Sequence, residues 1–142
     1  MGFIIGLEKP GIVGKIDMDD YELWLGLTYG SFSDMSEVLE KIDADTSKFW
    51  KIINRSKFSK GEPIILAIEK VEKLLPILVE FYIKLERHER LTGKRVHTGY
   101  QENVIKKESK QDDYFLSETG TLLGVIKLCL YSLQLKRRLL IH

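Results

Sequence analysis

The chain has 142 residues, of which 44% are hydrophobic and 10% aromatic, and its formal net charge at pH 7 is +1. This size and composition predict a single domain, residues 1–142. They exclude a protein without a hydrophobic core, because the chain is long enough and apolar enough to build one. The near-neutral total hides two halves of opposite sign, because residues 1–47 have a net charge of −7 and residues 48–142 one of +8. This asymmetry bears on partners and self-contact, since summed electrostatic potentials steer association without choosing a fold.

Residues 1–30 are predicted to be rich in β-strands. An apolar run over 1–7 predicts a first strand, and 12–18 predicts a second, which leads through a turn at Asp19-Asp20 into a third. In 21–29, Tyr and Leu alternate with other residues, a period of two that indicates a half-buried strand. We expect an antiparallel sheet of two or three strands, whose apolar face helices must cover because such a sheet is marginal alone.

Residues 33–142 are predicted to form a helical body. Asp34 and Glu37 mark the start of a first helix, and a second helical segment carries the apolar residues of 49–53. The polar stretch 93–118 predicts a mobile segment, or a polar helix around 100–110.

The longest predicted element begins at a capping box formed by Ser59 and Glu62 and continues to Leu91. Its polar positions keep helical spacing through Pro76, which predicts one helix bent at the proline and about 45 Å long. A compact domain of this size is only about 37 Å across, so we expect the helix end to project or to meet another chain.

A last helix over 119–141 is apolar almost all round, which predicts burial on most of its sides. The expected fold class is therefore α+β. A small N-terminal antiparallel sheet packs on a predominantly helical body that contains a long bent helix and an apolar C-terminal helix.

Motifs for catalysis or metal binding fail on inspection. The pair Gly14-Lys15 resembles the end of a phosphate-binding loop, but Lys9 stands where that loop needs glycine and Ile16 where it needs Ser or Thr. The aspartate-rich stretches lack the glycine and glutamate of a calcium loop, and the three histidines have no zinc spacing. We expect no catalytic residue, no metal and no cofactor.

Two arginine–histidine pairs suggest a further alternative. Arg90 with His97, and Arg137 with His142, resemble in spacing the Arg-x(4–6)-His motif of HEPN-type ribonucleases, which are also small helical proteins. That motif usually has a polar residue directly after the arginine. In this chain the position holds Leu91 in the first pair and Arg138 in the second. The resemblance implies a ribonuclease as the weakest of three functional hypotheses.

Composition also indicates where the protein works. The single cysteine, Cys129, excludes an intramolecular disulfide and favours a reducing compartment, so a cytoplasmic location is expected. The most apolar window, 122–135, is interrupted by Lys127 and is too short to span a bilayer, so no membrane association is expected. Sixteen lysines and fifteen isoleucines against two alanines are typical of AT-rich codons and favour a bacterial or phage source.

Basic residues gather in two clusters, 48–60 and 87–110. The first contains no acid and interleaves its bases with Phe49, Trp50 and Phe58, a pattern that suggests phosphate contact with stacking on nucleobases. The candidate contacts for an anion or nucleic acid are Lys51, Arg55, Arg90, Lys94 and Arg95. A nucleic-acid-binding regulator is therefore the second hypothesis, although a pI near 7.8 is low for a dedicated binder.

The favoured hypothesis starts from four acids around a predicted turn. Asp17, Asp19, Asp20 and Glu22 have no base close by in sequence beyond Lys15, and they predict an acidic surface that faces a partner. We expect a non-enzymatic intracellular binding protein that occludes or sequesters a protein partner, similar in size and composition to immunity proteins or phage counter-defence inhibitors. The apolar and projecting helices also predict a homo-oligomer, most simply a dimer.

Overall fold

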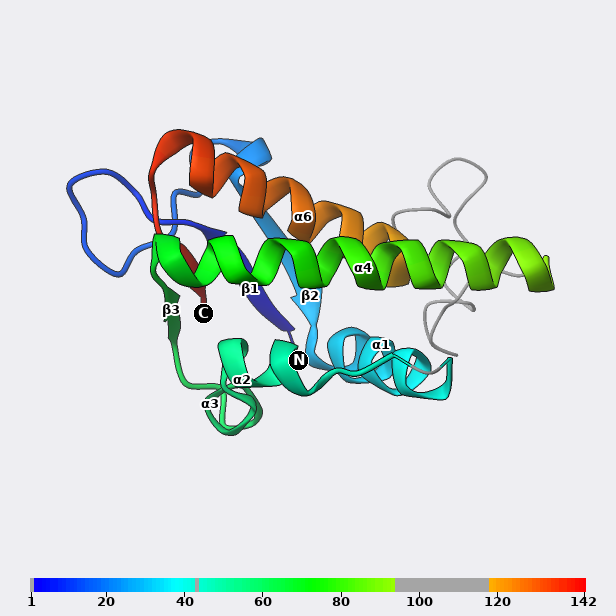
Figure 1. The fold of residues 1–142 in the computed structure, drawn as a ribbon. Coiled ribbons are helices and arrows are strands. Elements are labelled where there is room, and N and C mark those ends of the chain that lie inside the picture. The colour runs from blue at the N-terminus through cyan, green and yellow to red at the C-terminus, as the bar shows by residue number, and fades with distance from the viewer. Residues whose placement is uncertain (1, 43, 94–117) are drawn as a thin grey trace, which may run out of the picture.

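The computed structural model describes residues 2–42, 44–93 and 118–142, with the side chains of 28–34, 118 and 119 excepted. The elements are β1 (Gly2–Leu7), a 3-10 helix η1 (Tyr21–Leu23), β2 (Trp24–Thr28), α1 (Tyr29–Lys41), α2 (Ser47–Ile53), α3 (Arg55–Ser59), β3 (Ile64–Leu66), α4 (Ile68–Thr92), α6 (Glu118–Leu135) and β4 (Leu139–Ile141). A small antiparallel sheet with helices packed against it gives an α+β fold, which confirms the predicted class (Figure 1).

The sheet has the strand order β2-β1-β4-β3, and every neighbouring pair is antiparallel. Ile5 in β1 lies opposite Leu25 of β2 on one side and opposite Ile141 of β4 on the other. The first and last described segments of the chain therefore lie side by side in the middle of the sheet (Figure 1).

The two faces of β1 meet different neighbours. Phe3, Ile5 and Leu7 are at most 3% exposed and belong to the core shared with the helices. On the opposite face, Gly6 is covered by the side chains of Ile16 and Trp24. The connection between β1 and β2 thus covers this face of the sheet at Gly6, through Ile16.

Helices α4 and α6 lie side by side and run in opposite directions across the sheet (Figure 1). The buried residues of α4 recur at helical spacing and form one apolar face, as an amphipathic helix requires: Val71, Leu74, Leu78, Phe81 and Leu85. Helix α6 is more evenly apolar, and its Gly124 lies against the side chain of Leu25 in β2.

A chain of aromatic rings joins the sheet to three helices. Phe3 of β1 meets Phe58 of α3 edge to face at 5.1 Å between ring centroids. Trp50 of α2 lies 5.6 Å from Phe58 and 4.9 Å from Phe49, and Phe49 lies 5.8 Å from Phe81 of α4. Aromatic pairs at these separations add to the free energy of burial, so the basic α2–α3 region is anchored in the core.

The sequence predicts a sheet confined to the N-terminal part of the chain, and this prediction is wrong. Ile64–Leu66 and Leu139–Ile141, both assigned to helices, are strands β3 and β4, so residues 33–142 are not wholly helical. Conversely, 12–18 forms no strand and takes part only in an isolated bridge between Glu8 and Ile16. Apolar runs of three residues show no periodicity, which is why the pattern could not separate strand from helix there.

Two predicted helix starts are also wrong. Helix α1 begins at Tyr29 instead of Asp34, and α4 begins at Ile68, after β3, instead of at the Ser59–Glu62 capping box. The prediction that one helix continues through Pro76 is confirmed, and α4 ends at Thr92 with Gly93, at a positive φ of 70°, as its C-cap. With 25 residues it is about 37 Å long instead of about 45 Å, and the bend at the proline stays a prediction. The C-terminal end of α4 extends past α6 and α1 (Figure 1).

The predicted polar helix around 100–110 lies outside the described residues. None of the helices in the described ranges is long and apolar enough to cross a membrane.

Candidate functional site

The acidic segment, residues 17–22, lies in the connection between β1 and β2. Two of its acids have basic partners, contrary to expectation: Asp17 accepts a hydrogen bond from Arg137 Nη1 at 3.2 Å, and Asp19 pairs with Lys9 at 2.6 Å. The Asp17 side chain is 13% exposed and that of Asp19 is 76% exposed. Lys9 lowers the pKa of Asp19 through this hydrogen bond.

A third ion pair holds the start of the same connection to the chain before β4. Arg138 donates to both carboxylate oxygens of Glu8, from Nε at 2.8 Å and from Nη2 at 2.5 Å. The backbone N–H of Gly14 also donates to Glu8, at 2.7 Å. The hydrogen bond from Arg138, and then that from Gly14, lowers the pKa of Glu8 below its ordinary value.

These pairs join the acidic and basic halves of the chain to each other. Glu8 and Asp17 belong to the half of net charge −7, and Arg138 and Arg137 belong to the half of +8. The asymmetry read from the sequence is therefore partly neutralised within one molecule. The opposite net charge of the two halves was a signal in the sequence that ion pairs between them could form. Which residues pair could not be predicted, because that depends on the contact between β1 and β4.

Asp20 and Glu22 remain without a cationic partner among the described residues. Asp20 accepts a hydrogen bond from the backbone N–H of Glu22 at 2.9 Å and so caps η1. Glu22 accepts one from the Tyr131 hydroxyl at 3.3 Å. Tyr21, which lies between Asp20 and Glu22 in the sequence, is 87% exposed. This surface combines uncompensated negative charge with an exposed aromatic ring, which the sequence reasoning did not anticipate.

A pocket of about 240 Å³ adjoins the same residues. Its lining comes from η1, from β2 and from one side of α6, and includes Glu22, Leu25, Leu27, Gly120 and Gly124. Gly124 lets α6 approach β2 closely here, since a Cβ at this position would come within 2.9 Å of the Leu25 side chain. The sequence contains no signal for the pocket, because it lies beside the outermost strand of the described sheet, and strand order is not contained in local patterns.

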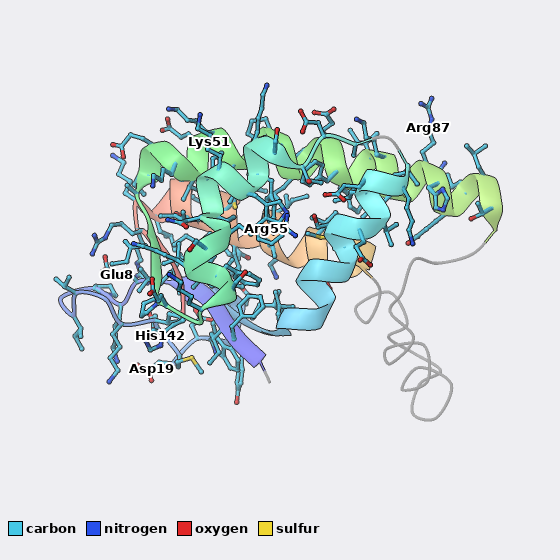
Figure 2. All side chains as sticks on the ribbon, turned by 90° about the horizontal axis from the view of Figure 1, so that it is seen from below. Glu8, Asp19, Lys51, Arg55, Arg87 and His142 are labelled. Atoms are coloured by element: carbon cyan, nitrogen blue, oxygen red, sulfur yellow. The ribbon has the colours of Figure 1, made fainter. Side chains whose placement is uncertain are left out.

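The candidate basic residues do not form one surface. Lys51 lies on α2 and Arg55 on α3, whereas Arg87 lies near the C-terminal end of α4, far from Lys51 (Figure 2). Arg90, three residues beyond Arg87, is ion-paired with Glu86. The candidates Lys94 and Arg95 lie outside the described residues.

The aromatic residues between the bases are part of the core. Phe49, Trp50 and Phe58 are 1%, 7% and 4% exposed, and the guanidinium of Arg55 lies 4.9 Å from the centre of the Trp50 ring. Buried rings cannot stack on nucleobases in this arrangement. The first basic cluster therefore has the charge but not the aromatic platform that its sequence suggested.

Other candidates for chemistry have structural roles. Burial raises the pKa of the Cys129 thiol to about 12, so little thiolate forms at neutral pH. In one arginine–histidine pair, Arg137 is bound to Asp17 and the backbone of His142 pairs with that of Ile4. In the described ranges no three His, Cys, Asp or Glu side chains come together as a metal site would need.

Comparisons with protein-family models, with curated proteins and with solved structures find no match to this chain. Function is therefore inferred from the surface chemistry of the molecule itself.

Proposed function

We propose that the protein is a non-enzymatic binding protein whose acidic segment engages a basic surface of a protein partner and so occludes it. The observation that carries this proposal is the exposed Tyr21, which lies in the sequence between Asp20 and Glu22, two acids that have no cationic partner among the described residues. Tyrosine is enriched at protein interfaces, and unpaired surface charge speeds association with a partner of opposite sign.

Neighbouring side chains support the same surface. Ile12 and Met18 are each 45% exposed and Val13 is 85% exposed, all in the connection that carries the acidic segment. Apolar side chains gathered in a polar surrounding are typical of interaction sites. A cytoplasmic location agrees with the buried, unpaired Cys129.

The test removes the two charges without removing the hydrogen-bond acceptors. A partner is first isolated from the native host on the tagged wild-type chain, and its association is then measured against the double variant Asp20→Asn, Glu22→Gln. We expect the association rate to fall by about three- to tenfold at low salt, and its dependence on salt to weaken. The matched control is Glu62→Gln, Glu69→Gln, which removes two exposed acids near the start of α4.

An unchanged association rate in the double variant, or an equal loss in the control, would overturn the proposal. Generic single-stranded RNA and DNA supply the other arm. Binding to them at sub-micromolar concentration in about 0.15 M salt, near physiological ionic strength, would favour the nucleic-acid hypothesis instead.

A homodimer is a second proposal, supported by the outer face of α4. Val79 and Ile83 on this face are 38% and 56% exposed. Glu72 and Arg90 lie on the same line of the helix, nine positions before and after Phe81, which is buried on the opposite side. If two copies of α4 pack antiparallel about a twofold axis, Val79 meets Ile83 and Glu72 meets Arg90 of the second copy.

Charge exchange tests this dimer. Wild-type protein is expected at twice the monomer mass of 16.5 kDa in light scattering at micromolar concentration. Glu72→Arg and Arg90→Glu should each weaken the dimer, since like charges then face each other, and the double variant should restore it. A monomer mass for wild-type protein throughout the micromolar range would contradict the proposal.

A further inference from the structure

The hydrogen bonds of the sheet show which backbone groups of β2 point outward. Ile4 exchanges both backbone hydrogen bonds with His142 on the β4 side, at 2.9 and 2.8 Å. In an antiparallel ladder the bonding direction alternates along the strand, so Phe3 and Ile5 bond towards β2. Their partners in register are Leu27 and Leu25. The N–H and C=O groups of Trp24 and Gly26 must therefore point away from the sheet.

This outer edge of β2 is open within the described residues. No backbone hydrogen bond to Trp24 or Gly26 exists there apart from the β1–β2 pairing, and β2 has no further strand beside it in the sheet. Gly26, at the centre of the strand, is exposed. The strand also lacks the charges and prolines with which proteins usually protect such edges against pairing with another chain.

The pocket beside β2 has the size and position to receive one side chain of an added strand. Its volume of about 240 Å³ is below the roughly 300–1,000 Å³ of typical small-molecule sites. Leu25 and Leu27 face α6, and they line the pocket together with Gly120, Gly124 and Leu128. A strand paired with β2 would direct every second side chain to this face, towards an apolar lining.

The charged residues beside the pocket indicate which kind of side chain would lie next to the apolar one on the added strand. Asp20 and Glu22 lie just before β2 and lack a cationic partner in the described structure, and Glu22 is among the residues that line the pocket. Lys127, another lining residue, lies over the ring of Tyr131 at 5.6 Å from its centroid. A basic side chain at one end of the added strand would therefore meet uncompensated negative charge beside β2.

We propose that β2 binds its partner as an added strand: an extended segment of another protein pairs its backbone with Trp24 and Gly26, places an apolar side chain in the pocket beside Gly124, and sets a basic side chain near Asp20 and Glu22. This is a known mode of peptide recognition, in which backbone hydrogen bonds supply affinity and side-chain pockets supply specificity. The inference rests on the proposed function and specifies the form of its partner.

A random peptide library displayed on phage, selected on the wild-type chain, is the probe. We expect peptides with alternating apolar residues and a basic residue at one end. In Gly26→Pro the outward N–H is lost while the bonds to β1, which use Leu25 and Leu27, are kept. Affinity for the selected peptides should fall about tenfold or more, because one backbone hydrogen bond to the added strand is lost and the proline ring occupies its place.

Two measurements keep the test independent of how Gly26→Pro folds. The Gly26 amide of the free wild-type chain should exchange quickly with solvent and become protected when peptide binds. N-methylation along a selected peptide should abolish binding at every second position, because only alternate N–H groups face β2.

Four results would overturn the added strand: no selected peptide, equal binding to Gly26→Pro, N-methylation effects without a period of two, or a Gly26 amide already protected in the free chain. Protection that rises with protein concentration would assign the edge to a second copy instead. If the native partner loses affinity for the Asp20→Asn, Glu22→Gln variant but binds Gly26→Pro unchanged, the proposed function stands and only the added strand fails.

Discussion

Gly6→Ala is expected to lower the free energy of unfolding by about 1–3 kcal/mol, because a Cβ at this position has no room. The added atom would lie 2.6 Å from a methyl carbon of Ile16, 2.8 Å from the backbone oxygen of Leu23 and 2.9 Å from Cβ of Trp24. Two of these atoms cannot move without moving the backbone. Urea unfolding of the wild type and the variant measures the difference.

Gly26→Ala is the matched control for this substitution. Gly26 lies on the same face of the same sheet, but a Cβ there would meet only a ring carbon of Trp24, at an ordinary contact distance of 3.9 Å. Alanine also suits a strand better than glycine, so this variant should be as stable as the wild type or slightly more so. Equal losses in the two variants would show that backbone freedom, and not crowding at Gly6, sets the cost.

Glu8→Gln is expected to remove a pH-dependent part of the stability. The pKa of Glu8 is lowered in the folded chain, so its contribution is fully present above the unfolded value of about 4.3 and is lost as the pH falls through the folded value. The variant should be less stable than the wild type near neutral pH, and the two stabilities should converge in acid. Urea unfolding at a series of pH values gives both curves.

Asp19→Asn provides the comparison for Glu8→Gln. Asp19 also has a lowered pKa and a basic partner, but its side chain is 76% exposed against 16% for Glu8. Water screens an exposed ion pair, so Asp19→Asn should change the stability and its pH dependence less than Glu8→Gln does. The reverse order would mean that the Glu8–Arg138 contact is not a structural tie.

The fold class was predictable because long patterns carry it. The apolar face of α4 extends from Val71 to Leu85, and α6 is apolar on nearly all sides, as is typical of a buried helix. Both helices could therefore be predicted from the sequence. The strands β3 and β4 were missed because three apolar residues fit either a strand or the end of a helix. Only the register with β1 decides between them, and that contact joins residues far apart in sequence.

The candidate site was predictable in part. The sequence located the acids at 17–22, but it could not tell that Asp17 and Asp19 have basic partners while Asp20 and Glu22 have none among the described residues. For Asp17 that distinction depends on Arg137, which is 120 positions away in the sequence and comes close to Asp17 only when the sheet has formed. Likewise the outer position of β2 follows from the strand order, which local patterns do not contain.

The central position of β4 has a consequence for how the molecule folds. β1 is made first, yet one of its two neighbours, β4, follows every other described element, and Ile5 must find Ile141. At translation rates of about 5–20 residues per second, β1 waits on the order of ten seconds for that neighbour. Closing so long a loop costs entropy before any contact compensates it, and such non-local pairing slows folding. Until β4 is made, the inner edge of β1 has no partner strand among the described elements, so we expect completion of the sheet to be a late step of folding.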